Sequence, residues 1–198
     1  LVDIHFHGCA GHDFSDGTPE ALQAIGAYEL CQGVTSICPA SMTLSEETLK
    51  TVCANAYAYT KRPEAEQDTG ARLIGIHLEG PFISMEKKGA QNPAYIRKPD
   101  VEMFLRLQEA AHGLVRLITI APETDGAKEF IRRLADQGPC VMIGRCADYI
   151  LAGRPDVVRV FVHADKDFCL EQAMKVDSLP ENEVAKKIAE IDEYRARY

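Results

Sequence analysis

The sequence predicts an α/β fold in which short parallel strands alternate with helices. The first observation is a series of apolar runs of strand length, at 2–6, 34–38, 72–78, 114–120, 140–143 and 157–162. The second is that helical stretches separate most of these runs. Because strands joined through helices pair in parallel, we expect a parallel sheet with helices packed outside it. In such folds the chemistry lies at the carboxyl ends of the strands.

Capping residues mark where the helices begin and end. Thr18 followed by Pro19 is typical of a helix start, and Gly33 closes that helix. The other helices are expected to begin near Ser45, Pro99 and Thr124, and the last to end at Gln137 before Gly138. The segment 80–98 is long for a connection, which makes it a candidate functional loop.

Composition restricts the classes of partner. With 198 residues, 46% hydrophobic and 26% charged, the chain is long enough to bury a substantial core. Its net charge of -8 comes from 22 basic and 30 acidic residues, spread along the chain without a basic block. This distribution argues against nucleic acid and against an anionic membrane as partners. We therefore expect a small-molecule substrate.

The cysteines indicate the compartment. The seven of them form an odd, irregularly spaced set without a C-x-x-C pair. This argues against a disulfide framework and a cysteine-based zinc site, and is typical of free thiols in a reducing cytoplasm. No apolar run approaches the ~20 residues of a membrane span, so we expect a cytoplasmic protein without membrane contact. Leu1 lies inside a strand-like run, so we expect a further segment before it in the gene product.

Two short segments each place candidate metal-binding residues at the end of a predicted strand. His5 and His7 are two residues apart, so in a strand they point to the same face. Glu79 ends a second strand directly before Gly80. Two imidazoles and a carboxylate form a mixed nitrogen and oxygen site of the kind that holds the divalent metals Zn2+, Fe2+ or Mn2+. The alternative is that these histidines are satisfied core or loop groups, but His-x-His at a strand end favours the metal site.

A joint pattern extends over residues 1 to about 137. Its segments are 2–8, 11–20, 74–82, 87–93 and 117–123. Together they resemble the first half of the catalytic barrel of the N-acetylglucosamine-6-phosphate deacetylase family, in the amidohydrolase superfamily. The run His-Leu-Glu-Gly-Pro with the loop Lys-Lys-Gly-Ala-x-Asn-Pro is specific to this family, whereas His-x-His marks only the superfamily. Within the first run, His77 is expected to be a packed, hydrogen-bonded histidine.

By this resemblance the protein is a metal-dependent hydrolase that removes the acetyl group from N-acetylglucosamine 6-phosphate, a phosphorylated amino sugar. Glu79 stands at the principal metal ligand, and His5 and His7 serve a second metal in those members that have one. Gln91 and Asn92 fall in the substrate-binding loop. A homodimer is compatible with the resemblance.

The resemblance also implies parts that are missing. In the family, two more metal-binding histidines end the fifth and sixth strands, and a later Asp is the base. Here 141–144 is followed by Arg145 and Cys146 where a His is expected, and the chain ends well short of the ~250 residues of a closed barrel. We therefore expect an incomplete TIM-type (β/α) barrel half that is inactive as it stands. His163, after the next apolar run, could replace one ligand, with Asp165 nearby as a base.

The last third carries a different pattern, from about residue 131 to 198. Its segments are 138–151, 160–164, 185–188 and 191–198, and they resemble the carboxyl-terminal part of the cytidylate-kinase-like family. By this resemblance Arg145 faces a nucleotide phosphate, with Arg195 or Arg197 near it. The alternative is a set of solvated surface cations. The G-x-x-x-x-G-K-[ST] phosphate loop of that family is absent from the sequence.

The two patterns meet inside the predicted helix at 130–138. The sequence therefore predicts a partial amidohydrolase barrel over 1–137 and a P-loop-kinase-like α/β fragment over 138–198, joined as a chimera. Three functions remain open. They are a sugar-amide hydrolase, which is favoured by coverage, a nucleotide-binding or phosphotransferase protein, and a non-catalytic remnant that keeps neither activity.

Overall fold

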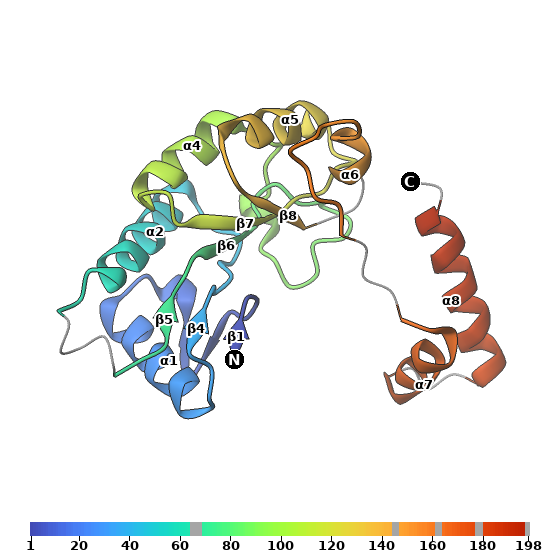
Figure 1. The fold of residues 1–198 in the computed structure, drawn as a ribbon, viewed down its shortest axis with the longest axis horizontal. Coiled ribbons are helices and arrows are strands. Elements are labelled where there is room, and N and C mark those ends of the chain that lie inside the picture. Colours follow the sequence, from blue (N-terminus) through green and yellow to red (C-terminus); the bar gives the residue numbers. More distant parts are fainter. Residues whose placement is uncertain (64–68, 144–146, 161–163, 177–179, 197–198) are drawn as a thin grey trace. The chain divides into compact units, whose positions relative to one another are not determined.

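The computed structural model describes residues 1–63, 69–143, 147–160, 164–176 and 180–196. The chain divides into two compact units, Leu1–Ile150 and Leu151–Tyr198. The first unit is a mixed α/β structure with parallel sheets, and the regular elements described in the second are helices (Figure 1). The boundary predicted from the sequence, between residues 137 and 138, lies inside the first unit.

The main strands of the first unit pair in parallel, as the sequence predicts. One sheet has the order β1–β4–β5 and another the order β6–β7–β8. Their bounds are Val2–Asp3 (β1), Ser36–Ile37 (β4), Arg72–Leu73 (β5), Ile76–Glu79 (β6), Val115–Thr119 (β7) and Val141–Ile143 (β8). A parallel bridge between Ala40 and His77 links the two sheets. Within the described residues these strands do not close into a barrel.

Helices connect the strands and lie outside the sheets (Figure 1). Their bounds are Pro19–Cys31 (α1), Glu46–Thr60 (α2), Val101–Ala110 (α4), Ala127–Gln137 (α5) and Ala147–Ile150 (α6). The predicted starts of α1, α2 and α4 are confirmed, because the side chains of Thr18, Ser45 and Asp100 each accept a hydrogen bond from a backbone N–H of the first turn. These caps satisfy amide groups that the helix itself cannot pair.

Helix α5 begins later than its predicted start at Thr124. Gly126 has a φ of 86°, a left-handed conformation that a right-handed helix cannot include. The amide of Ala127 instead donates to the carbonyl of Thr124 across 3.1 Å and closes a turn before the helix. The predicted end at Gln137, before Gly138, is confirmed.

A cluster of three buried aromatic rings joins the loop after β6 to α4 and α5. The rings of Phe82 and Phe130 have centroids 4.9 Å apart, and those of Phe104 and Phe130 are 6.1 Å apart. Phe82 and Phe130 are at most 1% exposed. Because the rings are packed at tilted and edge-on angles, each contributes more than its buried area alone. The cluster therefore anchors the start of the candidate functional loop to the core.

Strands β5 and β6 are separated by a break at Gly75. A Cβ at this position would lie 2.6 Å from Arg116 Cγ and 3.3 Å from Cys38 Sγ, so only glycine lets the neighbouring chains approach this closely. The pairing of β6 with β7 changes register next to the break, between Ile76 and His77. The break therefore lies directly before β6, in which side chains point alternately to the two faces, so that His77 and Glu79 share one face.

Two predictions about strands need correction or addition. The apolar run at 157–162 was predicted to be a strand, but residues 157–160 are irregular, and 161–162 lie outside the described residues. Val158 and Val160 are 87% and 80% exposed, and among the described residues no strand pairs with this segment to provide the ladder of hydrogen bonds that a strand requires. A short antiparallel hairpin of β2 (Gly8–Cys9) and β3 (His12–Asp13) was not predicted.

The second unit contains helices α7 (Lys166–Val176) and α8 (Glu181–Ala196), which contact each other.

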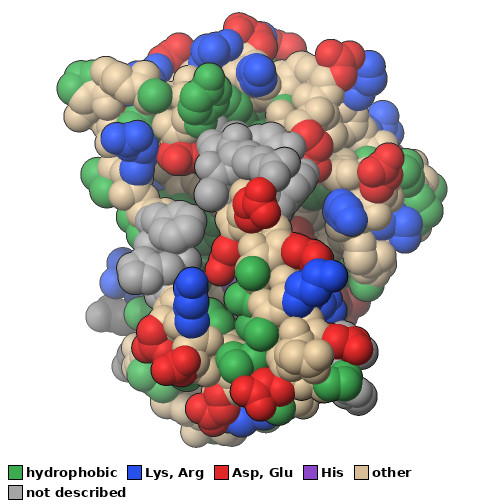
Figure 2. Space-filling view, turned by 90° about the vertical axis from the view of Figure 1, so that its right-hand side faces the viewer, with side chains coloured by type: hydrophobic (Ala, Val, Ile, Leu, Met, Phe, Trp, Pro, Cys, Tyr) green, Lys and Arg blue, Asp and Glu red, His purple; other side chains and the backbone are tan. Residues whose placement is uncertain are grey.

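On the face shown in Figure 2, acidic and basic side chains of the described residues are interspersed rather than separated by sign. Among the helices that the structure describes, none combines the length and the apolar character needed to cross a membrane.

A bidentate ion pair between α2 and α4 predicts a pH effect on stability. Arg106 donates to both oxygens of Glu46, at 2.6 and 3.0 Å, and Lys50 lies 2.9 Å from the same carboxylate. These hydrogen bonds lower the pKa of Glu46 to about 2, from 4.5. A lowered pKa in the folded state means that the pair stabilises above pH 4.5 and is lost as the pH falls towards 2.

We therefore expect Glu46→Gln to be slightly less stable than the parent at pH 7 and equal to it near pH 2. Urea midpoints measured across this range would test it. Glu123→Gln, which alters an exposed carboxylate, is the control and should show no such convergence. A constant difference between Glu46→Gln and the parent at all pH values would contradict the pairing.

Candidate metal centre

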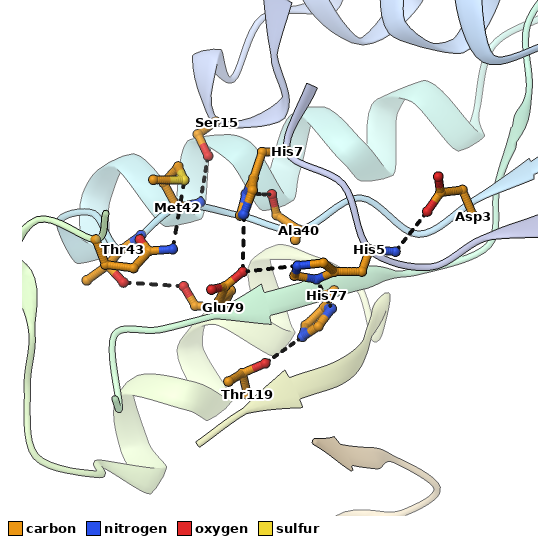
Figure 3. A network of polar contacts seen from close by, with 11 residues as sticks. Asp3, His5, His7, Ser15, Ala40, Met42, Thr43, His77, Glu79 and Thr119 are labelled. Atoms are coloured by element: carbon orange, nitrogen blue, oxygen red, sulfur yellow. Dashed lines mark hydrogen bonds and ion pairs between the residues drawn. The ribbon is translucent and has the colours of Figure 1, made fainter. Parts of the chain in front are cut away.

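Three residues predicted to bind a metal converge at the ends of β1 and β6. His7 Nε2 lies 3.2 Å and His5 Nε2 3.6 Å from Glu79 Oε2 (Figure 3). One ligand atom from each of the three residues lies within 4.8 Å of the other two. Ligand bonds of roughly 2.0–2.2 Å in a tetrahedral site place neighbouring ligand atoms about 3.4 Å apart. The spacing of the three atoms therefore fits a shared divalent cation.

The hydrogen bonding of His7 also fits a cation. His7 Nδ1 lies 3.1 Å from the carbonyl oxygen of Ala40, which can only accept, so Nδ1 carries the hydrogen. In a neutral imidazole, Nε2 then presents a lone pair to the carboxylate of Glu79. Glu79 Oε2 is itself buried and accepts no hydrogen bond from the described residues. With a neutral His7, two electron-rich atoms face each other without a hydrogen between them, and a cation placed there would satisfy both.

The turn after β6 fixes the position of Glu79. Gly80 has a φ of 82°, and a Cβ at this position would overlap the hydroxyl oxygen of Thr43. That hydroxyl donates to the carbonyl oxygen of Glu79 across 3.4 Å. Glycine therefore lets the strand end turn sharply against the neighbouring loop while the Glu79 side chain stays directed at His5 and His7 (Figure 3).

The two residues predicted to contact substrate use their amide groups within the protein. Gln91 is 5% exposed, and its Oε1 accepts a 2.7 Å hydrogen bond from the backbone N–H of Thr43. Asn92 is exposed, and its Oδ1 accepts from the N–H of Ala94 and caps a short helix, η2 (Pro93–Tyr95). Gln91 therefore fastens the loop at 80–98 to the loop that supports Glu79.

The predicted nucleotide-binding residues belong to parts that are largely not described. Arg145 and Arg197 lie outside the described residues, as does His163. Arg195 is in α8, but its side chain is not described. Asp165 is exposed, and its carboxylate accepts a 2.9 Å hydrogen bond from the N–H of Phe168 at the start of α7.

The structure adds His77 and Thr119 to the site. The expectation that His77 is packed and hydrogen-bonded is confirmed: it is 1% exposed, its Nδ1 lies 3.1 Å from His5 Nδ1, and its Nε2 lies 2.8 Å from Thr119 Oγ1. Burial lowers the pKa of His77, and the nearby imidazole of His5 lowers it further. The contact with His5 was not predicted, although the spacing of His77 and Glu79 places both on one face of a strand.

Comparison with known proteins separates the chain into two parts. The N-acetylglucosamine-6-phosphate deacetylase of Bacillus subtilis (strain 168) is 37% identical over 144 residues, which are 73% of this chain and 36% of that enzyme. The chain thus spans about 36% of the length of this relative. A crystal structure of N-acetyl-D-glucosamine-6-phosphate deacetylase from Mycobacterium smegmatis matches with a TM-score of 0.64 and 33% identity, over 72% of this chain and 35% of that one.

A variant of the Mycobacterium smegmatis enzyme, solved in complex with N-acetyl-D-glucosamine-6-phosphate, matches equally well, with a TM-score of 0.64. Residues 117–198 match the model of the cytidylate kinase-like family. This match begins upstream of the join that the sequence predicts at 130–138. The chain therefore has an amino-terminal part related to the N-acetylglucosamine-6-phosphate deacetylases and a carboxyl-terminal part that matches the cytidylate kinase-like family.

Proposed function

We propose that residues 1–137 are the first part of the (β/α) barrel of a metal-dependent deacetylase of N-acetylglucosamine 6-phosphate, and that the metal site persists in this chain without the rest of the catalytic machinery. The observation that carries the proposal is the convergence of His5, His7 and Glu79 at the carboxyl ends of parallel strands. The related enzymes support the substrate class.

In this proposal Glu79 Oε2 and the Nε2 atoms of His5 and His7 hold the metal. When bound, a divalent metal lowers the pKa of water and polarises an amide carbonyl. The carbonyl of Ala40 keeps His7 in the tautomer that presents Nε2. The side chains of His5 and His7 are 51% and 33% exposed, so this side of the site is open to a small ligand. Gln91 positions the loop beside it.

Metal analysis tests the site directly. We expect the purified chain to retain a divalent transition metal, and Glu79→Gln to lose most of it, because the carboxylate is the only anionic member of the three. His12→Gln is the matched control: His12 is in β3, and its contact is an exposed pair with Asp16 at 3.9 Å. Equal metal content in Glu79→Gln and His12→Gln at the same protein concentration would contradict the assignment.

A nucleotide-binding role is the second candidate, and the match of residues 117–198 to the cytidylate kinase-like family favours it. In this reading Arg145, Arg195 and Arg197 contact phosphate groups. The missing phosphate loop removes the backbone amides and the Lys that normally hold those groups. Stabilisation of the chain by ATP against thermal unfolding would support this role, and an unchanged unfolding temperature would argue against it.

A further inference from the structure

We propose that His77 and Thr119 form a hydrogen-bonded chain that holds His5 in the ring orientation and tautomer that a metal requires. This inference rests on the proposed metal site and adds two residues that do not touch the metal. His77 and Thr119 are therefore positioning residues, placed on neighbouring strands beneath His5 (Figure 3).

The geometry places the three side chains in a row. His5 Nδ1 lies 3.1 Å from His77 Nδ1, and His77 Nε2 lies 2.8 Å from Thr119 Oγ1. At the other end of His5, Nε2 faces Glu79 Oε2 at 3.6 Å. His77 is 1% exposed, so its ring nitrogens must find partners inside the protein.

The row has two possible arrangements of hydrogens, and only one suits a metal. Two Nδ1 atoms 3.1 Å apart share a single hydrogen. If His5 carries it, His5 Nε2 presents a lone pair towards Glu79, and His77 donates from Nε2 to Thr119 Oγ1. If His77 carries it, His5 Nε2 must hold a hydrogen, which would block coordination. Thr119 Oγ1 lies 2.8 Å from His77 Nε2, and its hydroxyl can accept in the first arrangement or donate in the second. A metal on His5 Nε2 therefore selects the first arrangement, in which Thr119 accepts the hydrogen of His77.

His5 and His7 are therefore oriented by different means. The carbonyl of Ala40 can only accept, so it fixes a neutral His7 in one tautomer. His77 can accept or donate, so it can accept the hydrogen of His5 when a metal occupies His5 Nε2, and Thr119 then accepts the hydrogen on His77 Nε2. The orientation of His5 therefore depends on Thr119, a residue of β7 that is far from His5 in the sequence.

Zinc affinity of His77 variants tests the inference. His77→Asn keeps an acceptor oxygen near the position of Nδ1, whereas His77→Leu removes it. Measured by competition with a chelating dye, the dissociation constant for Zn2+ should rise 10- to 100-fold in His77→Leu and much less in His77→Asn. Thr119→Val keeps the side-chain shape and should weaken zinc binding severalfold. It provides the test if His77→Leu does not fold. His12→Gln should bind as the parent does.

A second measurement reads the tautomers themselves. In the zinc-loaded parent, the imidazole 15N shifts should show the hydrogen of His5 on Nδ1 and that of His77 on Nε2. The reverse assignment for His77 would overturn the inference, as would equal losses of affinity in His77→Leu and His77→Asn, which would indicate a packing effect. Parent-like affinity in the His77 and Thr119 variants would overturn it while leaving the metal site intact. A parent that binds no zinc would overturn both.

Discussion

Incubation of the purified chain with N-acetylglucosamine 6-phosphate and Zn2+ is expected to release no glucosamine 6-phosphate above background. The proposed site has three ligand side chains, and the resemblance to the deacetylases implies further histidines and an Asp base from later strands. The sequence has Arg145 and Cys146 where the first of those histidines would stand. Because the members of a catalytic constellation act together, the loss of several of them reduces turnover by several powers of ten.

A complete deacetylase assayed at the same enzyme concentration provides the reference rate. Glu79→Gln provides the control for contaminating activity, since any turnover by the proposed site must vanish in this variant. A rate within tenfold of the complete enzyme, abolished by Glu79→Gln, would contradict the prediction and would mean that other residues of this chain supply the base and the missing ligands.

Removal of the Phe130 ring should give the largest loss of stability among simple core substitutions. Phe130 is 1% exposed and packs against both Phe82 and Phe104. Truncation of a buried Phe to Ala typically costs about 3–5 kcal/mol, through lost burial and the cavity left behind. Since small domains are stable by only about 5–15 kcal/mol, Phe130→Ala should remove a substantial part of the stability of the first unit.

Urea unfolding followed by circular dichroism would measure this loss. Tyr28→Ala is the matched control, because Tyr28 is an aromatic residue of α1 that is 45% exposed. We expect Tyr28→Ala to lower the urea midpoint much less than Phe130→Ala does. Similar midpoints for the two variants would show that the aromatic cluster does not anchor the loop after β6.

The elements of the first unit could be predicted because their signals are local. Helix starts at Thr18, Ser45 and Asp100 depend on side chains within one turn, and the strands depend on apolar runs bounded by turn residues. Residues 157–160 of the predicted run at 157–162 are not a strand, because strand formation needs a partner that a local apolar run does not specify. The late start of α5 depends on one left-handed glycine, Gly126.

The convergence of His5, His7 and Glu79 was predictable for a similar reason. A general rule places the carboxyl ends of parallel strands on one side of a sheet, so residues far apart in sequence could be brought together without a structure. The role of His77 could not be predicted in this way. It depends on the pairing of β6 with β7 and on the distance from His5, which only the three-dimensional arrangement provides.

The break at Gly75 connects the proposed metal site with a position that bears no functional atom. Any side chain there would press on Arg116 of β7 and on Cys38, and so would move the strand that supplies Thr119 relative to the one that supplies Glu79. Tolerance to substitution at this position is therefore governed by ligand spacing as well as by packing. A larger residue at Gly75 is therefore expected to weaken metal binding, although Gly75 takes no part in the chemistry.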